Sequence, residues 1–197
     1  MPEPFELSRV VDTIRESMDV KRLLAEQCAE DIFRIGTLLS QVAGDDGLIM
    51  LCGNGGSAAD SQHIAAELVV RLRSSVERDA IAALALTVDT SILTAGGNDY
   101  GFENIFARQV EAYGREGDAL IAISTSGNSE NIIAAVEAAN EAEIHTIGLL
   151  GGSGGALKDL VDDAVIVPSS VTARIQECHI LIGHIWCEMI EESMLQE

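Results

Sequence analysis

The chain has 197 residues, 47% of them hydrophobic, which is enough for one sizeable core and predicts a single globular domain over residues 1–197. Twelve basic against 32 acidic residues give a formal net charge of −20, which opposes general nucleic-acid binding because that binding depends on Lys and Arg neutralising phosphates. The sequence has neither an apolar run near the roughly 18–20 residues that cross a bilayer nor the basic start and apolar segment of a signal peptide, so we expect a cytoplasmic protein without a membrane partner.

Two helices are predicted ahead of the first strand, over about residues 7–41, with a break near Ser17–Asp19. Apolar residues recur there at helical spacing. Helices in this place have no crossover role between strands, so we expect residues 1–43 to pack against the body of the domain or against another subunit. A turn at residues 44–47 then leads into a buried strand at Leu48–Cys52.

Apolar strands and helical segments alternate through the rest of the chain. Further strands are predicted at residues 80–87, 119–123, 145–149 and 164–167. Helices are predicted after residue 57 and at 89–95, 102–113, 130–142, 156–160 and 172–192, with a loop at 96–99. This alternation predicts an α/β fold, a three-layer sandwich whose five-stranded parallel sheet is flavodoxin-like or Rossmann-like. Ligands in such folds bind beyond the carboxyl ends of the strands.

The first strand leads into a Gly-rich loop and a helix, LCGNGGSAADSQHIAAEL at residues 51–68. Glycines allow tight turns and close approach of a ligand to the backbone. Ser57 is predicted to cap the helix, whose first N–H groups then face an anion. His63 and Glu67 are four residues apart and project from one helix face, one turn below that anion. An ordinary strand-to-helix turn with a surface His–Glu pair explains this stretch equally well when it is taken alone.

A second polar loop, STSGNS at residues 124–129, follows the third predicted strand. Its hydroxyl groups and a helix N-terminus at Ser129 suit a phosphate monoester, whose oxygens all accept hydrogen bonds. The loop is not a Walker motif, because no GK[ST] follows, and GNGGSA is not a GxGxxG fingerprint. The alternative is a helix cap with a spare polar turn, but the density of donors favours phosphate binding.

The last predicted helix carries Gln176 and His184 on one broad face, about two turns apart. Together with His63 and Glu67 they are reasonable ligands for zinc or a similar divalent ion if the four side chains converge. Glutamine is an uncommon ligand, so composition alone favours a site without metal. For His184 alone, an ordinary buried histidine is the default.

The four cysteines, at positions 28, 52, 178 and 187, form no CxxC pair. We expect them to be reduced residues of the core, in keeping with a cytoplasmic protein.

The motifs together resemble those of the phosphoheptose isomerase family, whose members are built on the sugar isomerase (SIS) domain. The resemblance covers nearly the whole chain and rests on four segments: CGNGGSAADSQHIAAEL, GNDYGFENIFARQV, AISTSGNSENI and TARIQECHILIGHIWCEMIE. GNGGSA or STSGNS alone would indicate only a SIS domain that binds a sugar phosphate. The four segments in combination are far more specific.

This resemblance implies an enzyme that converts sedoheptulose 7-phosphate into D-glycero-D-manno-heptose 7-phosphate, the first step toward nucleotide-activated heptose. It implies Glu67 and His184 as the proton-transfer pair, and one zinc ion per subunit held by His63, Glu67, Gln176 and His184. It implies a homotetramer with active sites at subunit boundaries. The substrate-binding residues it implies are Asn54, Gly55, Gly56, Ser57, Glu67, Arg71, Asn98, Asp99, Ser124, Thr125, Ser126, Ser129 and Gln176. One departure is Ala173, where some members have Asp.

Two other functions use the same domain. A regulator of replication initiation resembles this chain in fold and assembly and binds a protein partner, but such members generally lack the Glu/His pair that is present here. A sugar-phosphate-sensing regulator would need a fused DNA-binding domain, for which 197 residues leave no room. The sequence therefore favours the enzyme.

Overall fold

The computed structural model describes residues 6–195 and contains one parallel sheet of five strands in the order β2-β1-β3-β4-β5. The strands are β1 (Ile49–Gly53), β2 (Ala83–Ala85), β3 (Ala119–Ser124), β4 (His145–Gly151) and β5 (Asp163–Val167). Every residue of β1 and β3 is buried, as expected for central strands covered on both faces. The predicted five-stranded α/β fold is confirmed.

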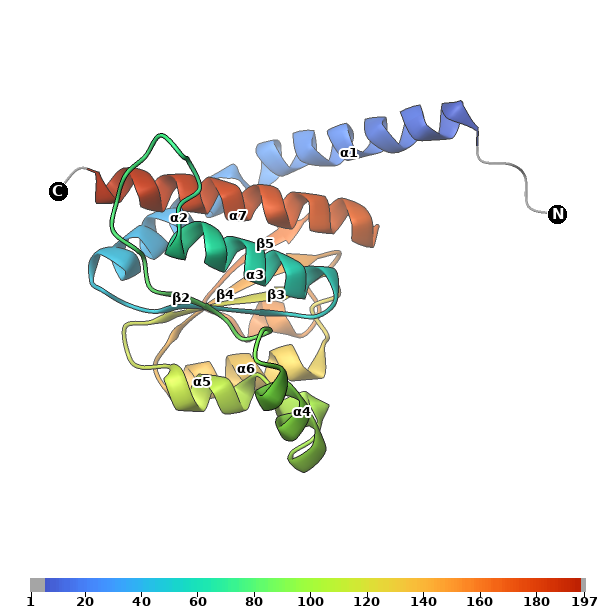
Figure 1. Cartoon of the computed structure of the whole chain (residues 1–197). Helices are drawn as coiled ribbons and strands as arrows, with labels where there is room; N and C mark the ends of the chain where they lie inside the picture. The colour runs from blue at the N-terminus through green and yellow to red at the C-terminus, as the bar shows by residue number, and fades with distance from the viewer. Residues whose placement is uncertain (1–5, 196–197) are drawn as a thin grey trace.

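Helices cover both faces of the sheet (Figure 1). One face carries α2 (Ala29–Gly44), α3 (Gly56–Val69) and α7 (Thr172–Met194), and the other carries α4 (Thr90–Asp99), α5 (Ala107–Tyr113) and α6 (Glu130–Glu141). Alternate strand residues serve the two cores: Leu51 packs with the first group of helices and Met50 with the second. Short 3₁₀ helices at Phe102–Asn104 and Leu157–Asp159 complete the structure.

The first helix, α1 (Leu7–Gln27), projects from the body of the domain (Figure 1). The predicted break near Ser17–Asp19 is wrong, because α1 runs through these residues and the chain bends at Cys28. Ser17 does not disturb the helix, since its hydroxyl donates to Glu177 of α7 (2.6 Å). The bend lies where Cys28 enters the core, with its sulfur 3.6 Å from the carbonyl of Ile166.

Two predicted segments near the sheet edge differ from the structure. The strand expected over residues 80–87 is paired only at Ala83–Ala85, because β2 is an edge strand with β1 as its neighbour. The loop expected at 96–99 is instead the last turn of α4, and the predicted helix at 102–113 is divided into a 3₁₀ turn and α5. Asp89 caps α4 by accepting hydrogen bonds from the N–H groups of Ser91 and Ile92 (both 2.9 Å). This cap stabilises the N-terminus of α4, and the helix continues through its two glycines.

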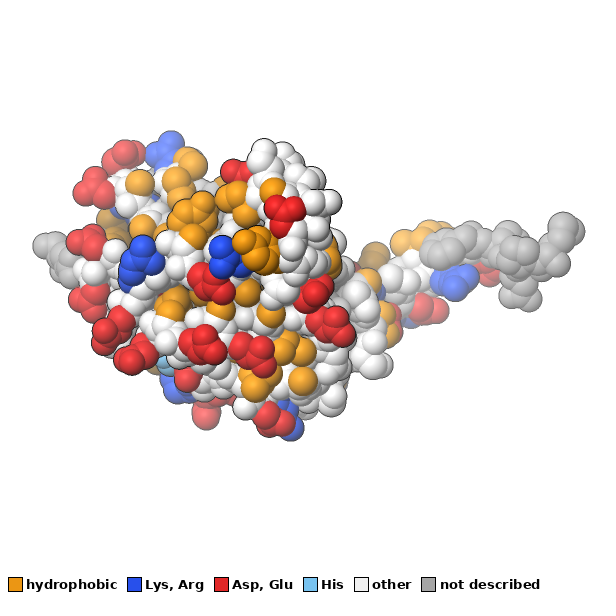
Figure 2. Space-filling view, turned by 90° about the horizontal axis from the view of Figure 1, so that it is seen from below, with side chains coloured by type: hydrophobic (Ala, Val, Ile, Leu, Met, Phe, Trp, Pro, Cys, Tyr) orange, Lys and Arg blue, Asp and Glu red, His pale blue; other side chains and the backbone are white. Residues whose placement is uncertain are grey.

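The surface is strongly acidic, and Figure 2 shows Asp and Glu side chains spread over one whole face among hydrophobic and neutral ones. Between residues 6 and 195, no helix is both long enough and apolar enough to span a membrane. All four cysteines are buried free thiols, as predicted, and burial raises the pKa of Cys52 and of Cys187 to about 12.

Candidate active site

The two polar loops leave neighbouring strands at the same edge of the sheet. Gly53, at the end of β1, pairs with Ile123 of β3, so the loops that follow both strands lie side by side. A reciprocal amide pair joins them: Asn54 and Asn131 each donate to the other's side-chain oxygen, at 2.8 Å. Both loops follow the strands after which they were predicted, and these strands are neighbours in the sheet.

The first loop turns sharply at Gly55, whose φ of +57° favours glycine. Gly55 is the N-cap of α3, so the prediction of Ser57 as the cap is wrong. Ser57 lies inside the first turn, where its N–H donates to the carbonyl of Asn54 (3.0 Å) and its side chain is buried. Gly53 makes room for this turn, since a Cβ there would lie 2.6 Å from the carbonyl oxygen of Ser57.

The second loop is held in shape by its own hydroxyl groups. The Ser124 hydroxyl accepts the N–H of Gly127 (3.1 Å) and lies 3.3 Å from the Ser129 hydroxyl. Ser126 is exposed and accepts the N–H of Asn128 (3.2 Å), while Thr125 is half-buried. Ser129 is the N-cap of α6, as predicted, and its side chain makes no bond to the helix.

Three of the predicted chemical groups meet between α3 and α7. His63 Nε2 lies 2.9 Å from His184 Nε2 and 3.3 Å from Glu67 Oε1. The two imidazole rings meet edge to face, with centroids 5.1 Å apart. His63 is exposed and Glu67 is 21% exposed at the side chain, so the group is open to a small molecule on one side.

Gln176 lies near the N-terminus of α7, where that helix packs on the start of α3. Its amide lies over the start of α3, where a Cβ on Gly56 would come within 2.5 Å of the amide nitrogen. The four predicted metal ligands therefore lie along the line where α3 and α7 pack together. Among residues 6–195, however, no group of three or more His, Cys, Asp and Glu side chains is already arranged to hold a metal ion.

Asp60 is a further residue of this region that the motifs did not single out. Its Oδ2 is buried and has no hydrogen-bond partner within the described part of the chain. Burial raises the pKa of Asp60, while the neighbouring imidazoles of His63 and His184 oppose that rise. The signal in the sequence was its position one turn before His63, on the same helix face.

Three further predicted substrate contacts bind other side chains of this chain. Arg71 was expected one helical turn after Glu67, but α3 ends at Val69, and the Arg71 guanidinium binds the carboxylate of Glu77 at 3.0 Å. Asn98 and Asp99 lie in the exposed last turn of α4, where the amide of Asn98 donates to Asp99 at 2.6 Å.

Comparison with known proteins places this arrangement in a family. A family model described as the SIS domain matches residues 14–151. The chain is 50% identical to the phosphoheptose isomerase of Pelodictyon phaeoclathratiforme over 94% of its own length and 88% of the relative's. It is 53% identical to that of a Roseiflexus species, over 95% and 94% of the two chains. The chain belongs to the phosphoheptose isomerase family.

Solved structures of phosphoheptose isomerases have the same fold. The enzyme of Neisseria gonorrhoeae superposes with a TM-score of 0.88 at 46% identity, covering 94% of this chain and 98% of the other. That of Francisella tularensis superposes with a TM-score of 0.92 at 38% identity, covering 96% and 100%. Coverage this complete means that the N-terminal helices, the sheet and α7 are all shared with phosphoheptose isomerases.

Proposed function

We propose that this chain is an aldose–ketose isomerase that converts sedoheptulose 7-phosphate into D-glycero-D-manno-heptose 7-phosphate. The observation that carries the proposal is the meeting of His63, Glu67 and His184 between α7 and α3, the helix that follows the first of two adjacent polar loops. Membership of the phosphoheptose isomerase family supports the same reaction. No redox cofactor is needed, because the reaction moves protons between two carbons and between their oxygens.

The two loops supply the phosphate site. Phosphate oxygens accept hydrogen bonds, and the exposed hydroxyl of Ser126 and the N-terminus of α6 beyond Ser129 offer donors and a positive dipole end. The amide pair of Asn54 and Asn131 keeps both loops at a fixed separation. With the phosphate bound here, the other end of an extended sugar can reach toward α7.

Glu67 and His184 carry the proton transfers. The Glu67 carboxylate removes the carbon-bound proton next to the carbonyl, giving an enediol, and returns a proton to the adjacent carbon. His184 passes a proton between the two oxygens, a role suited to an imidazole, whose ring nitrogens can both donate and accept a proton. The contact of both side chains with His63 holds them in one small region.

A single Zn²⁺ per subunit, held by His63, Glu67, Gln176 and His184, is part of the proposal. Zinc bonds of about 2.0–2.2 Å at tetrahedral angles separate neighbouring ligand atoms by roughly 3.3 Å. Glu67 Oε1 and His63 Nε2 are 3.3 Å apart, which matches this separation. The Nε2 atoms of His63 and His184 are 2.9 Å apart and would have to move slightly further from each other. When bound, zinc would polarise the substrate carbonyl as a Lewis acid. It would also compete for the carboxylate and imidazole that move protons, so we rank acid–base catalysis first.

The test is a proton-NMR assay with sedoheptulose 7-phosphate, which should show the anomeric signal of the aldose product growing with time. A purified wild-type protein that leaves the ketose unchanged, with and without added Zn²⁺, would contradict the proposed reaction. Full activity after exhaustive chelation, confirmed by metal analysis, would remove zinc from the mechanism and leave the acid–base pair in place.

A non-catalytic regulator that binds a protein partner is the alternative function for this fold. The side chains that such a regulator lacks, Glu67 and His184, are both present here and in contact with His63. The curated relatives quoted above are isomerases. The alternative is therefore not favoured.

We also propose that the protein is a homotetramer in the cytoplasm that binds no nucleic acid. Apolar side chains exposed on α1 support the assembly, since Leu7, Ile14 and Met18 are 78%, 57% and 65% exposed. Four buried free thiols support a reducing compartment, and the net charge of −20 opposes nucleic-acid binding.

A further inference from the structure

We propose that the buried ion pair between Arg78 and Glu191 is a positioning device that sets the place of Glu67 relative to His184. The inference rests on the proposed function, in which those two residues move the protons. Neither side chain bonds to the Glu67 carboxylate or to the His184 imidazole; Arg78 contacts only the main chain of Glu67. They act through the end of α3 and through the packing of α3 against α7.

The main chain of Glu67 lies in the last turn of α3, where carbonyl groups lack partners within the helix. Arg78 supplies the missing donor, since its Nη2 lies 2.8 Å from the Glu67 carbonyl oxygen. The guanidinium also donates through Nη1 to the carbonyl of Asp79 (2.8 Å) and through Nε to Glu191 (3.3 Å). All three of its nitrogens are therefore used, and its orientation is fixed.

Glu191 anchors the guanidinium from α7. Its side chain is fully buried, and that of Arg78 is only 2% exposed. The carboxylate also accepts the N–H of Leu72 (2.9 Å) and the Nε of Arg73 (3.1 Å). Burial alone would raise the pKa of Glu191, but the bonds from Leu72 and Arg73 and the charge of Arg78 outweigh burial and hold the pKa below its ordinary value. Glu191 thus remains charged and ties Leu72, Arg73 and Arg78, in the segment between α3 and β2, to α7.

The helices α3 and α7 run parallel, with an offset in numbering of 119 to 121 residues between contacting positions. Gly56 lies against Gln176 and Ile64 against Gly183, where a Cβ on Gly183 would be 2.5 Å from the Ile64 side chain. Leu72 lies against Glu191. Glu191 follows His184 by seven residues, two turns further along the same helix face. The ion pair is therefore the last contact in the series that holds Glu67 and His184 together.

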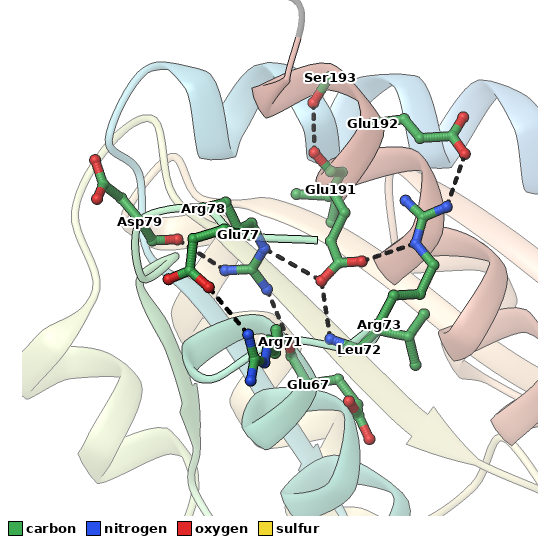
Figure 3. Close-up of polar contacts among 11 residues, drawn as sticks. Glu67, Arg71, Leu72, Arg73, Glu77, Arg78, Asp79, Glu191, Glu192 and Ser193 are labelled. Carbon is green, nitrogen blue, oxygen red and sulfur yellow. Dashed lines mark hydrogen bonds and ion pairs between the residues drawn. The ribbon is translucent and has the colours of Figure 1, made fainter. Parts of the chain in front are cut away.

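Figure 3 shows the division of roles at Glu67. Its main chain faces the guanidinium of Arg78, while its carboxylate points away from the ion-pair network. A side chain that holds the Glu67 backbone can fix the direction of the Glu67 carboxylate. Because it leaves that carboxylate free, it does not compete with the substrate for the carboxylate oxygens. This is the arrangement expected of a positioning residue, because misplacement of a catalytic group by about 1 Å can cost on the order of 100-fold in rate.

The test compares Arg78→Met with Arg73→Met as the matched control. Both substitutions remove a guanidinium from the same carboxylate, but Arg73 makes no bond to Glu67. We expect Arg78→Met to lower kcat for sedoheptulose 7-phosphate about 10- to 100-fold with a nearly unchanged KM, since the phosphate loops are untouched. Arg73→Met should keep kcat within about twofold of wild type. Arg78→Lys should recover part of the loss, because lysine keeps the charge but cannot donate in three fixed directions.

Hydrogen exchange of the amides of residues 65–70 gives a second readout that needs no substrate. Exchange should be faster in Arg78→Met than in Arg73→Met, because only the former frees the end of α3. Equal kcat in the two folded variants, or equal exchange, would overturn the proposal. If Arg78→Met does not fold, Arg78→Lys and Glu191→Gln take its place in both measurements. If the wild type fails to isomerise sedoheptulose 7-phosphate, the proposed function is contradicted. The role of Arg78 at the end of α3 is then still tested by hydrogen exchange, which is measured without substrate.

Discussion

In the proposed mechanism, Glu67 and His184 are the side chains on which turnover depends most directly. General acid–base groups typically contribute about 10²- to 10⁴-fold each, so Glu67→Gln and His184→Asn should each lower kcat by at least about 100-fold. Both variants should still bind sugar phosphate, because the loops at residues 54–57 and 124–129 are unaltered. The NMR assay measures turnover and calorimetry with a heptitol phosphate measures binding. A folded Glu67→Gln variant with wild-type turnover would rule out this assignment.

In the proposed phosphate site, we expect Ser126 to contact the phosphate, because its side chain is exposed while that of Ser124 is buried. We expect Ser126→Ala to raise the Kd for the heptitol phosphate several-fold, consistent with the loss of one hydrogen bond to a charged group. Some loss in kcat should follow, since remote binding orients the reacting end. Ser91→Ala, at an exposed hydroxyl on α4, is the control and should leave affinity unchanged. Unaltered affinity in Ser126→Ala would place the phosphate elsewhere.

Side chains that occur in a motif on one element were predictable from the sequence, and those that depend on how elements meet were not. The spacing of His63 and Glu67 implied a shared helix face, and the structure places both beside His184. Asp60 could not be predicted, because its significance comes from burial next to those imidazoles, which packing alone creates. Ser57 was misassigned as a cap because the neighbouring Gly55 adopts the turn conformation instead.

The close packing of α3 on α7 depends on Gly183. A methyl group there would lie 2.5 Å from the Ile64 side chain, so Gly183→Ala must push the helices apart or force a strained rotamer. Overpacking of this kind typically costs about 1–3 kcal/mol of stability. Chemical denaturation should show this loss, and kcat should fall because His184 is the next residue. Gly152→Ala, where no atom lies within 4 Å of the added Cβ but φ is +62°, controls for the general cost of replacing a glycine.

The five strands were predictable because each is a short apolar run, whereas helix boundaries depended on tertiary contacts. The break between the first two helices was expected at Ser17–Asp19, where the local sequence is polar. It lies instead at Cys28, where burial of the thiol fixes the bend. Gly96 and Gly97 favour a loop because of their poor helix propensity, but the Asp89 cap and helical hydrogen bonding outweigh it.

Assembly is the prediction that concerns the chain as a whole. Light scattering at micromolar concentration should give four times the monomer mass of 20.9 kDa. Ile14→Glu and Met18→Glu, on the exposed apolar face of α1, should reduce that mass because a buried charge without a partner is costly. Arg15→Glu, at a side chain that is 71% exposed, is the matched control and should leave the mass unchanged. A monomer mass for the wild type would refute the tetramer.

The parallel packing of α3 with α7 also has a consequence for how the protein is made. His63 and His184 are separated by 121 residues, so the first half of the site leaves the ribosome long before the second. Until α7 emerges, the face of the sheet that it covers stays open, and the carbonyl of Ile32 lacks the indole N–H of Trp186 (2.9 Å). Contacts this distant in sequence close slowly. Chains still being synthesised should therefore be inactive and in need of protection from aggregation, and Trp186 fluorescence would report the moment at which the last helix docks.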